Sequence, residues 1–231
     1  MISQLPLDIT LGESASFDSF VEGDNSQALS SIRDCAAGKG EKFLYLWGTE
    51  GTGRSHLLQA ACRFGAQSGQ AVSYLPLAQI DSFTPDILLG LEGMDLVCVD
   101  DIQMVAGKPP WEQALFHLYN RLRDGGARMM VSGDRVHAEL PLKLPDLGSR
   151  LAWGLGYRLQ PLGDADKTQA LIGNAKGRGL VLPVETARYI LEHTARDMGS
   201  LIATLEKLDL ASLAAGRKLT IPFVRTFLGN L

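Results

Sequence analysis

The sequence predicts an α/β protein built on a parallel sheet with a phosphate-binding loop, followed by a smaller unit made only of helices. Three observations lead to this fold class. Apolar strand patterns alternate with helical patterns between residues 26 and 132, which is typical of a parallel sheet with right-handed crossovers. A glycine-rich loop, GTEGTGRS, follows the first strand pattern at residues 48–55. After Leu162 only helical patterns remain.

The composition argues against several other classes of protein. With 231 residues, of which 45% are hydrophobic and 21% charged, the chain has the make-up of an ordinary packed protein. The formal net charge is −4 and no Lys or Arg precedes Arg33, which argues against strong DNA binding by the chain itself. The three cysteines lack CxxC spacing, so a reducing cytoplasm is expected. No signal-like or membrane-length apolar run occurs, so no membrane association is expected.

The elements of the first unit follow from its apolar and turn residues. Residues 1–25 are acidic and turn-rich, which indicates an extended arm. Asn25 and Ser26 can cap a first helix, and the run FLYLW after it is typical of a strand buried on both faces. The expected elements are helices over 26–37, 54–68, 85–91 and 111–124, and strands over 43–47, 71–75, 96–100 and 128–132.

The second unit is expected to be a nearly neutral helical lid. Its helices are predicted over 164–176, 184–194 and 199–215, with a short one after Pro222. Residues 163–231 hold 9 basic and 7 acidic groups, a balance of +2, so the lid has no obvious basic surface for DNA. The predicted boundaries are 1–15 for the arm, 16–162 for the α/β unit and 163–231 for the lid.

The loop has the spacing of a G-x-x-x-x-G-K-[ST] phosphate-binding loop, with an arginine in place of the lysine. Its glycines let backbone amides turn toward phosphate oxygens, the following helix adds the partial charge of its N-terminus, and Ser55 offers a hydroxyl to Mg²⁺. The alternative is a glycine-rich turn without a ligand. The candidate nucleotide-binding residues are Gly48, Glu50, Gly51, Thr52, Gly53, Arg54, Ser55 and His56.

The replacement of the lysine by Arg54 bears on what this site can do. A guanidinium is planar and bulkier than the compact ammonium that normally contacts the β- and γ-phosphates. We therefore expect nucleotide binding to survive at this site and efficient hydrolysis to be lost.

Two acids end a buried strand pattern, LVCVDD, at residues 96–101. Asp100 is expected at the carboxyl edge of the sheet beside the loop, where it can order Mg²⁺ through water. Asp101 can orient an attacking water. The alternative is that these acids only cap the next turn.

Several stretches resemble the bacterial replication initiator DnaA and its AAA+ family. They are VDDIQMVAGK at 99–108, FDSFVEGDN at 17–25 and the G-x-G-R-S-H-L-L loop, and the similarity covers most of residues 15–228. The resemblance implies an AAA+ P-loop NTPase core with a parallel sheet, followed by a small all-helical lid domain. The chain stops at Leu231, where the initiator would continue into its DNA-binding domain. In this it is similar to regulatory members of the family that inactivate DnaA.

The resemblance also implies roles for individual residues. Asp134, in the sequence SGD, is similar to sensor 1, although these residues are also ordinary turn chemistry. Arg150, in LGSRLAWG, is similar to the arginine finger that acts in trans on a neighbour's nucleotide, with a structural salt bridge as the alternative. Gly199 stands where the family has its sensor 2 arginine. Arg196, three residues earlier, is the alternative contact to the nucleotide.

The N-terminal arm carries a second short motif. Gln4, Leu5, Pro6 and Leu7 resemble the segment by which replication proteins bind the DNA polymerase III sliding β clamp. An extended segment can offer a glutamine to the rim of a pocket and leucines to apolar subsites, and the proline favours the extended state. The alternative is a tail whose leucines pack on its own domain.

The resemblance implies a regulatory function rather than an enzyme. The protein is expected to hold ADP and Mg²⁺, to be tethered to the DNA-loaded clamp, and to stimulate hydrolysis of DnaA-bound ATP, which prevents re-initiation of chromosome replication. Its own ATPase activity is expected to be weak at most. Two alternatives stay open, a self-sufficient AAA+ ATPase of the helicase-loader type and a scaffold whose nucleotide is structural. The base of the nucleotide and the oligomeric state, a homo-oligomer included, stay open as well.

Overall fold

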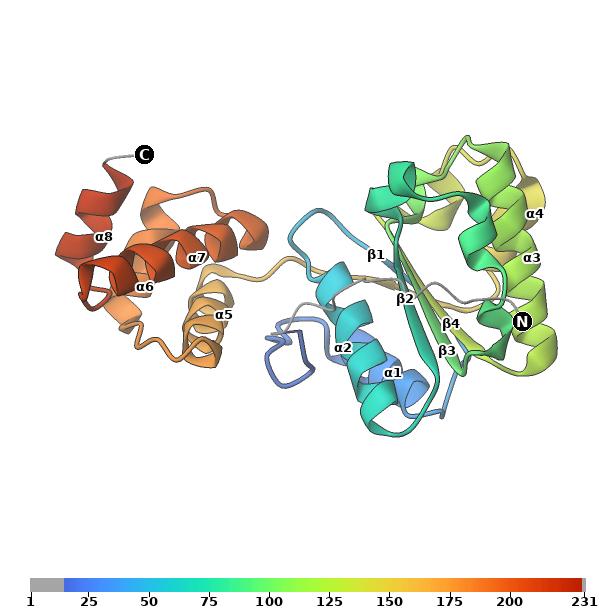
Figure 1. Ribbon diagram of the computed structural model, residues 1–231, viewed down its shortest axis with the longest axis horizontal. Coiled ribbons are helices and arrows are strands. Elements are labelled where there is room, and N and C mark those ends of the chain that lie inside the picture. The colour runs from blue at the N-terminus through green and yellow to red at the C-terminus, as the bar shows by residue number, and fades with distance from the viewer. Residues whose placement is uncertain (1–14, 230–231) are drawn as a thin grey trace.

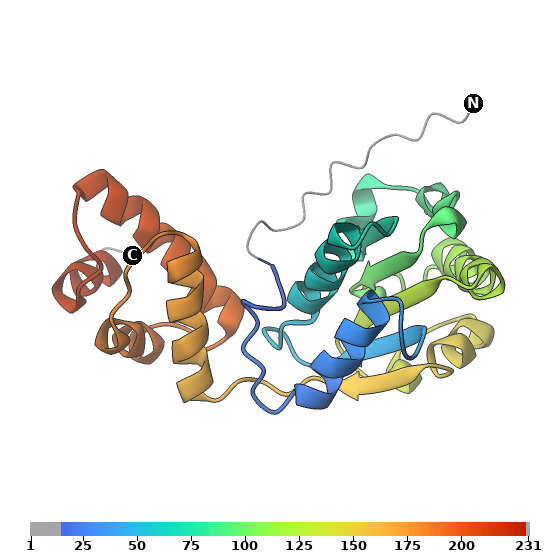
Figure 2. The same cartoon turned by 90° about the horizontal axis from the view of Figure 1, so that it is seen from below.

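The computed structural model describes residues 15–229, which form an α/β unit joined by an extended segment to an all-helical unit (Figure 1). The helical unit lies to one side of the α/β unit, as a second view also shows (Figure 2). This arrangement confirms the predicted fold class, a parallel-sheet core followed by a small helical lid. None of the described helices is long and apolar enough to cross a membrane.

The α/β unit contains one fully parallel sheet. Its strands are β1 (Phe43–Trp47), β2 (Val72–Pro76), β3 (Leu96–Asp100), β4 (Arg128–Gly133) and β5 (Leu155–Arg158). Their order is β2-β3-β4-β1-β5, so β4 lies between the strand that precedes the glycine-rich loop and the strand that ends in the acids. Because parallel strands end at the same edge of a sheet, the segments that follow β1, β3 and β4 meet there.

Helices cover both faces of this sheet. They are α1 (Ser26–Ala36), α2 (Arg54–Gln67), α3 (Pro109–Gly125) and α4 (Pro145–Leu151). The first two lie on one face and the last two on the other (Figure 1). Along β1, Leu44 and Leu46 pack on the side of α1 and α2, whereas Tyr45 packs on the side of α3 and α4. Burial on both faces explains why the strands read as continuous apolar runs.

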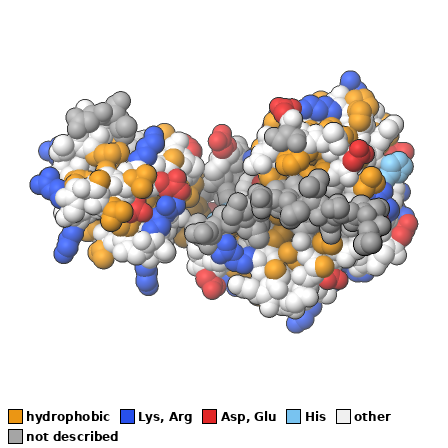
Figure 3. Space-filling view, in the orientation of Figure 1, with side chains coloured by type: hydrophobic (Ala, Val, Ile, Leu, Met, Phe, Trp, Pro, Cys, Tyr) orange, Lys and Arg blue, Asp and Glu red, His pale blue; other side chains and the backbone are white. Residues whose placement is uncertain are grey.

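The lid is a bundle with its own apolar core. Its helices are α5 (Asp164–Gly177), α6 (Val184–His193), α7 (Met198–Ala215) and α8 (Ile221–Leu228). Leu201, Leu205 and Leu208 recur at helical spacing on α7 and are fully buried with Ile190 of α6. On the face shown in Figure 3, Lys and Arg side chains of the lid are separated by uncharged and acidic ones. This distribution agrees with the near-neutral balance of charge in its sequence.

One α-helix and one strand of the α/β unit were not predicted, and each has a physical reason. The seven residues of α4 are too few to display a helical period. The side chains of β5 are mostly exposed, so this edge strand shows no apolar run. Its approach to β1 depends on Gly154, where a Cβ atom would lie 1.9 Å from the carbonyl oxygen of Phe43. The helix expected near 85–91 is instead part of a series of 3₁₀ turns at Leu77–Ser82, Pro85–Leu88 and Leu91–Gly93.

Candidate nucleotide site

The glycine-rich loop joins β1 to α2, as predicted. Gly51 and Gly53 adopt φ angles of 79° and 89°, a region open to glycine but unfavourable for other residues. No side chain caps α2, so the amides of its first turn lack an intrahelical partner and are available to an anion. Thr52 Oγ1 donates to the carbonyl oxygen of Thr49 at 2.8 Å. At Gly48 a Cβ atom would lie 2.9 Å from the carbonyl oxygen of Leu159, so the crowded start of the loop also requires glycine.

A segment that precedes α1 packs over this loop. A Cβ atom at Gly53 would lie 2.6 Å from the ring of Phe20, and the rings of Phe20 and His56 are 5.7 Å apart. His56 Nε2 donates to the carbonyl oxygen of Ser16 at 2.9 Å. Among the predicted loop residues, Glu50 is exposed and His56 is largely covered by this segment. The contacts of His56 therefore serve to hold the segment on α2.

Acidification is expected to loosen this segment. Burial lowers the pKa of His56 below its usual range, and the nearby charge of Arg63 adds to the effect. Because the unfolded chain takes up the proton more readily, stability is full above the ordinary histidine pKa of about 6.5 and falls as the pH drops toward the folded-state value. NMR titration of the His56 ring, with urea unfolding at each pH, measures both quantities. In His56→Gln this component of the pH dependence is expected to disappear, and its persistence would exclude His56 as the cause.

Asp100 ends β3 and is held by two hydroxyl groups. It is 3% exposed and accepts hydrogen bonds from the Tyr74 hydroxyl at 2.6 Å and from Ser132 Oγ on β4. Burial and the neighbouring carboxylate raise the pKa of Tyr74 above its usual range, so the phenol keeps its proton. No cluster of three metal-ligating side chains occurs among the described residues. The water-mediated contact of Asp100 with Mg²⁺ stays a prediction from the sequence.

Asp101 lies next to the loop in an unusual conformation. Its φ of 59° is the only positive one among the described residues other than glycine, and such strain tends to occur at functional sites. Its amide donates to Ser132 Oγ at 3.0 Å. Its Oδ1 atom accepts a hydrogen bond from Gln103 Nε2 at 2.9 Å and lies 3.3 Å from the Arg54 guanidinium. The structure therefore brings two predicted site residues, Arg54 and Asp101, into direct contact.

Asp134 is connected to the same network through its backbone. Its amide donates to Gln103 Oε1 at 3.2 Å, so Gln103 links the end of β4 to Asp101. The Asp134 carboxylate accepts two hydrogen bonds from Arg135, and these lower its pKa. Ser132 and Gln103 were not predicted as site residues. Gln103 had a signal in the motif VDDIQ, where it lies two residues after Asp101, the acid that it contacts. Ser132 had no such signal, because it reaches Asp100 and Asp101 from the neighbouring strand.

The lid contributes the start of α7. A Cβ atom at Gly51 would lie 3.1 Å from the Met198 amide nitrogen, so this helix begins beside the loop and places Gly199 there. Asp197 caps the helix by accepting from the Ser200 amide at 2.8 Å. Arg196 lies 3.5 Å from Asp164, and both side chains are at least 60% exposed. The structure thus places the predicted substitute for sensor 2 in an exposed ion pair near the site.

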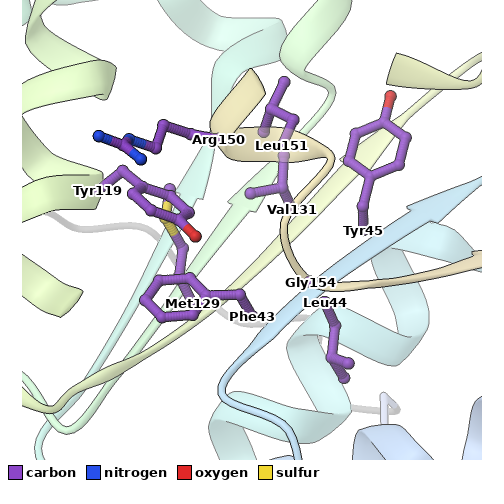
Figure 4. Close-up of a pocket in the computed structure, with 9 residues that line it drawn as sticks. All are labelled: Phe43, Leu44, Tyr45, Tyr119, Met129, Val131, Arg150, Leu151 and Gly154. Carbon is purple, nitrogen blue, oxygen red and sulfur yellow. The ribbon is translucent and has the colours of Figure 1, made fainter. Parts of the chain in front are cut away.

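Arg150 lies on α4 among aromatic rings. Its guanidinium carbon is 4.4 Å from the centre of the Trp153 ring and within 6.0 Å of the centres of Phe116 and Tyr119. Figure 4 shows its side chain extending from the helix toward Tyr119. Its Nε atom is buried without a hydrogen-bond partner, and no carboxylate among residues 15–229 forms a salt bridge with it. The structural salt bridge considered as the alternative is therefore not present in the described part of the chain.

The position of Arg150 separates it from the chain's own loop. The cavity beside it holds only about 10 Å³ and is lined in part by Phe43 and Gly154, residues at the start of β1 and in the turn before β5. The loop instead follows Trp47, at the opposite end of β1 and about 13 Å from Phe43 at the rise of a strand. Arg150 is thus placed away from the phosphate loop of its own chain.

The predicted clamp-binding residues Gln4, Leu5, Pro6 and Leu7 lie outside the described residues.

A parallel sheet with this loop after β1, acids after β3 and a following helical lid defines a P-loop nucleotide-binding module of the AAA+ class. Comparison with known protein families identifies the family of this chain. Residues 11–158 match the family described as the bacterial DnaA ATPase domain, and residues 164–228 match the Hda lid domain. The chain therefore belongs to the DnaA ATPase-domain family and carries a lid of the Hda type, which makes it a replication-related AAA+ protein.

Solved structures support the same fold. Domain III of the replication initiation protein DnaA from Thermotoga maritima is 24% identical, with a TM-score of 0.84, over 96% of this chain and 98% of that chain. AMPPCP-bound DnaA from Aquifex aeolicus is 21% identical, with a TM-score of 0.72, over 87% of this chain and 67% of that one. The RuvB branch migration motor of Thermotoga maritima is 13% identical, with a TM-score of 0.70, over 96% and 74%. At such identities the likeness concerns the fold alone.

Proposed function

We propose that this protein is a regulatory AAA+ protein that holds a nucleoside diphosphate and supplies Arg150 in trans to ATP bound by DnaA. Hydrolysis of that ATP inactivates the initiator and prevents re-initiation. The protein is proposed to act while tethered by residues 4–7 to the DNA-loaded sliding clamp. In this view it activates a partner's ATPase and has little turnover of its own.

The observation that carries the proposal is the surroundings of the Arg150 guanidinium. An arginine finger needs a guanidinium whose donors are free to meet charge developing on a transferred phosphoryl group. Arg150 has no acidic partner among the described residues and stacks on Trp153, which is 63% exposed. Because it is also placed away from its own loop, a nucleotide held by a neighbouring molecule is the natural target.

The loop residues fit an adenine nucleotide with Mg²⁺ as the ligand. Gly51 and Gly53 have the φ angles that let amides converge on phosphate, and one buried nitrogen of Arg54, Nη1, lacks a hydrogen-bond partner. Gly51, Thr52, Gly53 and Arg54 would surround the phosphates, and Ser55 with Asp100 would hold Mg²⁺. The DnaA of Aquifex aeolicus binds AMPPCP, which supports an adenine nucleotide here.

The test is hydrolysis of ATP bound beforehand to DnaA, measured with clamp loaded on DNA, with and without this protein. Strong acceleration that depends on loaded clamp is the expected result. The protein alone, incubated with ATP, serves as the control for its own turnover. Brisk turnover by the protein alone that is abolished in Asp101→Asn would instead support the self-sufficient ATPase. Clamp binding without any acceleration would support the scaffold.

A further inference from the structure

Two charged residues that a P-loop ATPase uses separately are paired with each other in this site. Arg54 Nη2 lies 3.3 Å from Asp101 Oδ1, and the two side chains are only 11% and 22% exposed. A phosphate-loop cation ordinarily faces the nucleotide, and a strand-end acid ordinarily orients water. Here the charges of the two side chains partly neutralise each other without any contribution from a nucleotide.

The longer guanidinium makes this contact possible. Arg54 is the first residue of α2, and its planar fork extends farther from the backbone than a lysine ammonium does. One arm of the fork meets Asp101, while the other nitrogen, Nη1, is buried without a hydrogen-bond partner. The guanidinium thus has one donor nitrogen committed to the acid and one left for an anion at the loop.

Asp101 is fixed more firmly than Arg54. Its backbone is in the left-handed region, its amide is bonded to Ser132, and its carboxylate also accepts from Gln103. A ligand that draws Arg54 away therefore leaves the carboxylate behind. A mostly buried carboxylate that loses its cation is unfavourable, more so beside added negative charge.

We propose that the Arg54–Asp101 ion pair makes this site select a nucleoside diphosphate over a triphosphate. A third phosphate competes with Asp101 for Arg54 and brings its own charge next to the abandoned carboxylate, whereas a diphosphate leaves the pair intact. The pair also keeps Asp101 from acting on water, so the same contact would make the protein's own hydrolysis of ATP weak. This inference rests on the nucleotide-binding part of the proposed function.

A double-mutant cycle on the full chain tests the pair. A fluorescent ADP derivative (mant-ADP) is displaced by ADP or by AMPPCP in the presence of Mg²⁺, for the wild type, Asp101→Asn, Arg54→Lys and the double variant. In the wild type ADP is expected to bind about tenfold more tightly than AMPPCP, and Asp101→Asn should bring the ratio near one. In the Arg54→Lys background the same change should alter the ratio less than about threefold, which gives a coupling typical of contacting residues.

A matched control is available in the lid. Arg178 and Glu206 form an ion pair of the same type at 2.6 Å, and Arg178→Lys with Glu206→Gln should leave the ADP-to-AMPPCP ratio unchanged. If Asp101→Asn improves AMPPCP binding equally with Arg54 or Lys at position 54, the gain is general relief of repulsion and the proposed selection is wrong. Failure of the wild type to bind mant-ADP at all would overturn the nucleotide site itself, which is a distinct outcome.

Discussion

Arg150→Ala is expected to abolish acceleration of DnaA-bound ATP hydrolysis, lowering the rate by about 10³-fold or more. The reason is that the two-pronged guanidinium would meet charge that develops on the phosphoryl group only during transfer. Arg150→Lys should recover little, because an ammonium cannot reproduce the fork. Single-turnover hydrolysis of radiolabelled ATP bound to DnaA, at saturating variant, measures the effect on the chemical step.

Arg123→Ala is the matched control for this prediction. Arg123 also lies over the Trp153 ring, at 5.8 Å, but it is paired with Asp124. Its removal should change the rate less than tenfold, because its guanidinium is already engaged by the Asp124 carboxylate. Binding of mant-ADP and retention on the clamp should be the same for both variants. Equal loss in Arg123→Ala and Arg150→Ala would show that the surface as a whole is needed and would contradict a finger role for Arg150.

Glu112→Gln is expected to lower the free energy of unfolding of the α/β unit by about 3 kcal/mol or more. Glu112 is fully buried, and its carboxylate accepts hydrogen bonds from the amides of Gly107, Lys143 and Leu144 at 2.6, 2.9 and 2.7 Å. A glutamine turns one acceptor into a donor that faces these amides. Because Lys143 and Leu144 lead directly into α4, acceleration of hydrolysis through Arg150 should weaken as well.

Urea unfolding followed by tryptophan fluorescence measures this change in the free energy of unfolding of the α/β unit. All three tryptophans, Trp47, Trp111 and Trp153, belong to the α/β unit, so lid unfolding contributes little to the signal. Exposed Glu139 provides the control, since Glu139→Gln removes the same charge and should alter stability by less than about 0.5 kcal/mol. A Glu112→Gln midpoint equal to that of the control would contradict the role assigned to the buried carboxylate.

The sequence predicted most of the framework because its signals are local. The strand over 43–47, the loop after it and the strand over 96–100 each combine a buried run with turn or acidic residues at its end, and the structure places all three as expected. The four lid helices were also predicted. Elements without such a signal, the edge strand β5 and the seven-residue α4, could not be predicted in this way.

The contacts within the site were less predictable because they depend on which strands are neighbours. Ser132 reaches Asp100 only because β4 lies next to β3, and the order of strands is not written in either motif. The pairing of Arg54 with Asp101 likewise depends on tertiary geometry. The sequence identified both residues, but it predicted that Arg54 contacts phosphate and that Asp101 orients water. The roles proposed for Asp134, Arg150 and residues 4–7 stay predictions.

Asn25 connects two chain segments at the joint between the α/β unit and the lid. Its side chain donates to the carbonyl oxygen of Gln160 at 3.1 Å and accepts from the Gln160 amide at 2.7 Å, which fastens the segment before α1 to the segment that leads from β5 to the lid. A rotation of the lid that leaves these two hydrogen bonds intact has to occur after Gln160, and there Pro161 has a fixed φ. Through Asn25, the described residues that precede α1 are therefore coupled to the connection between the sheet and the lid.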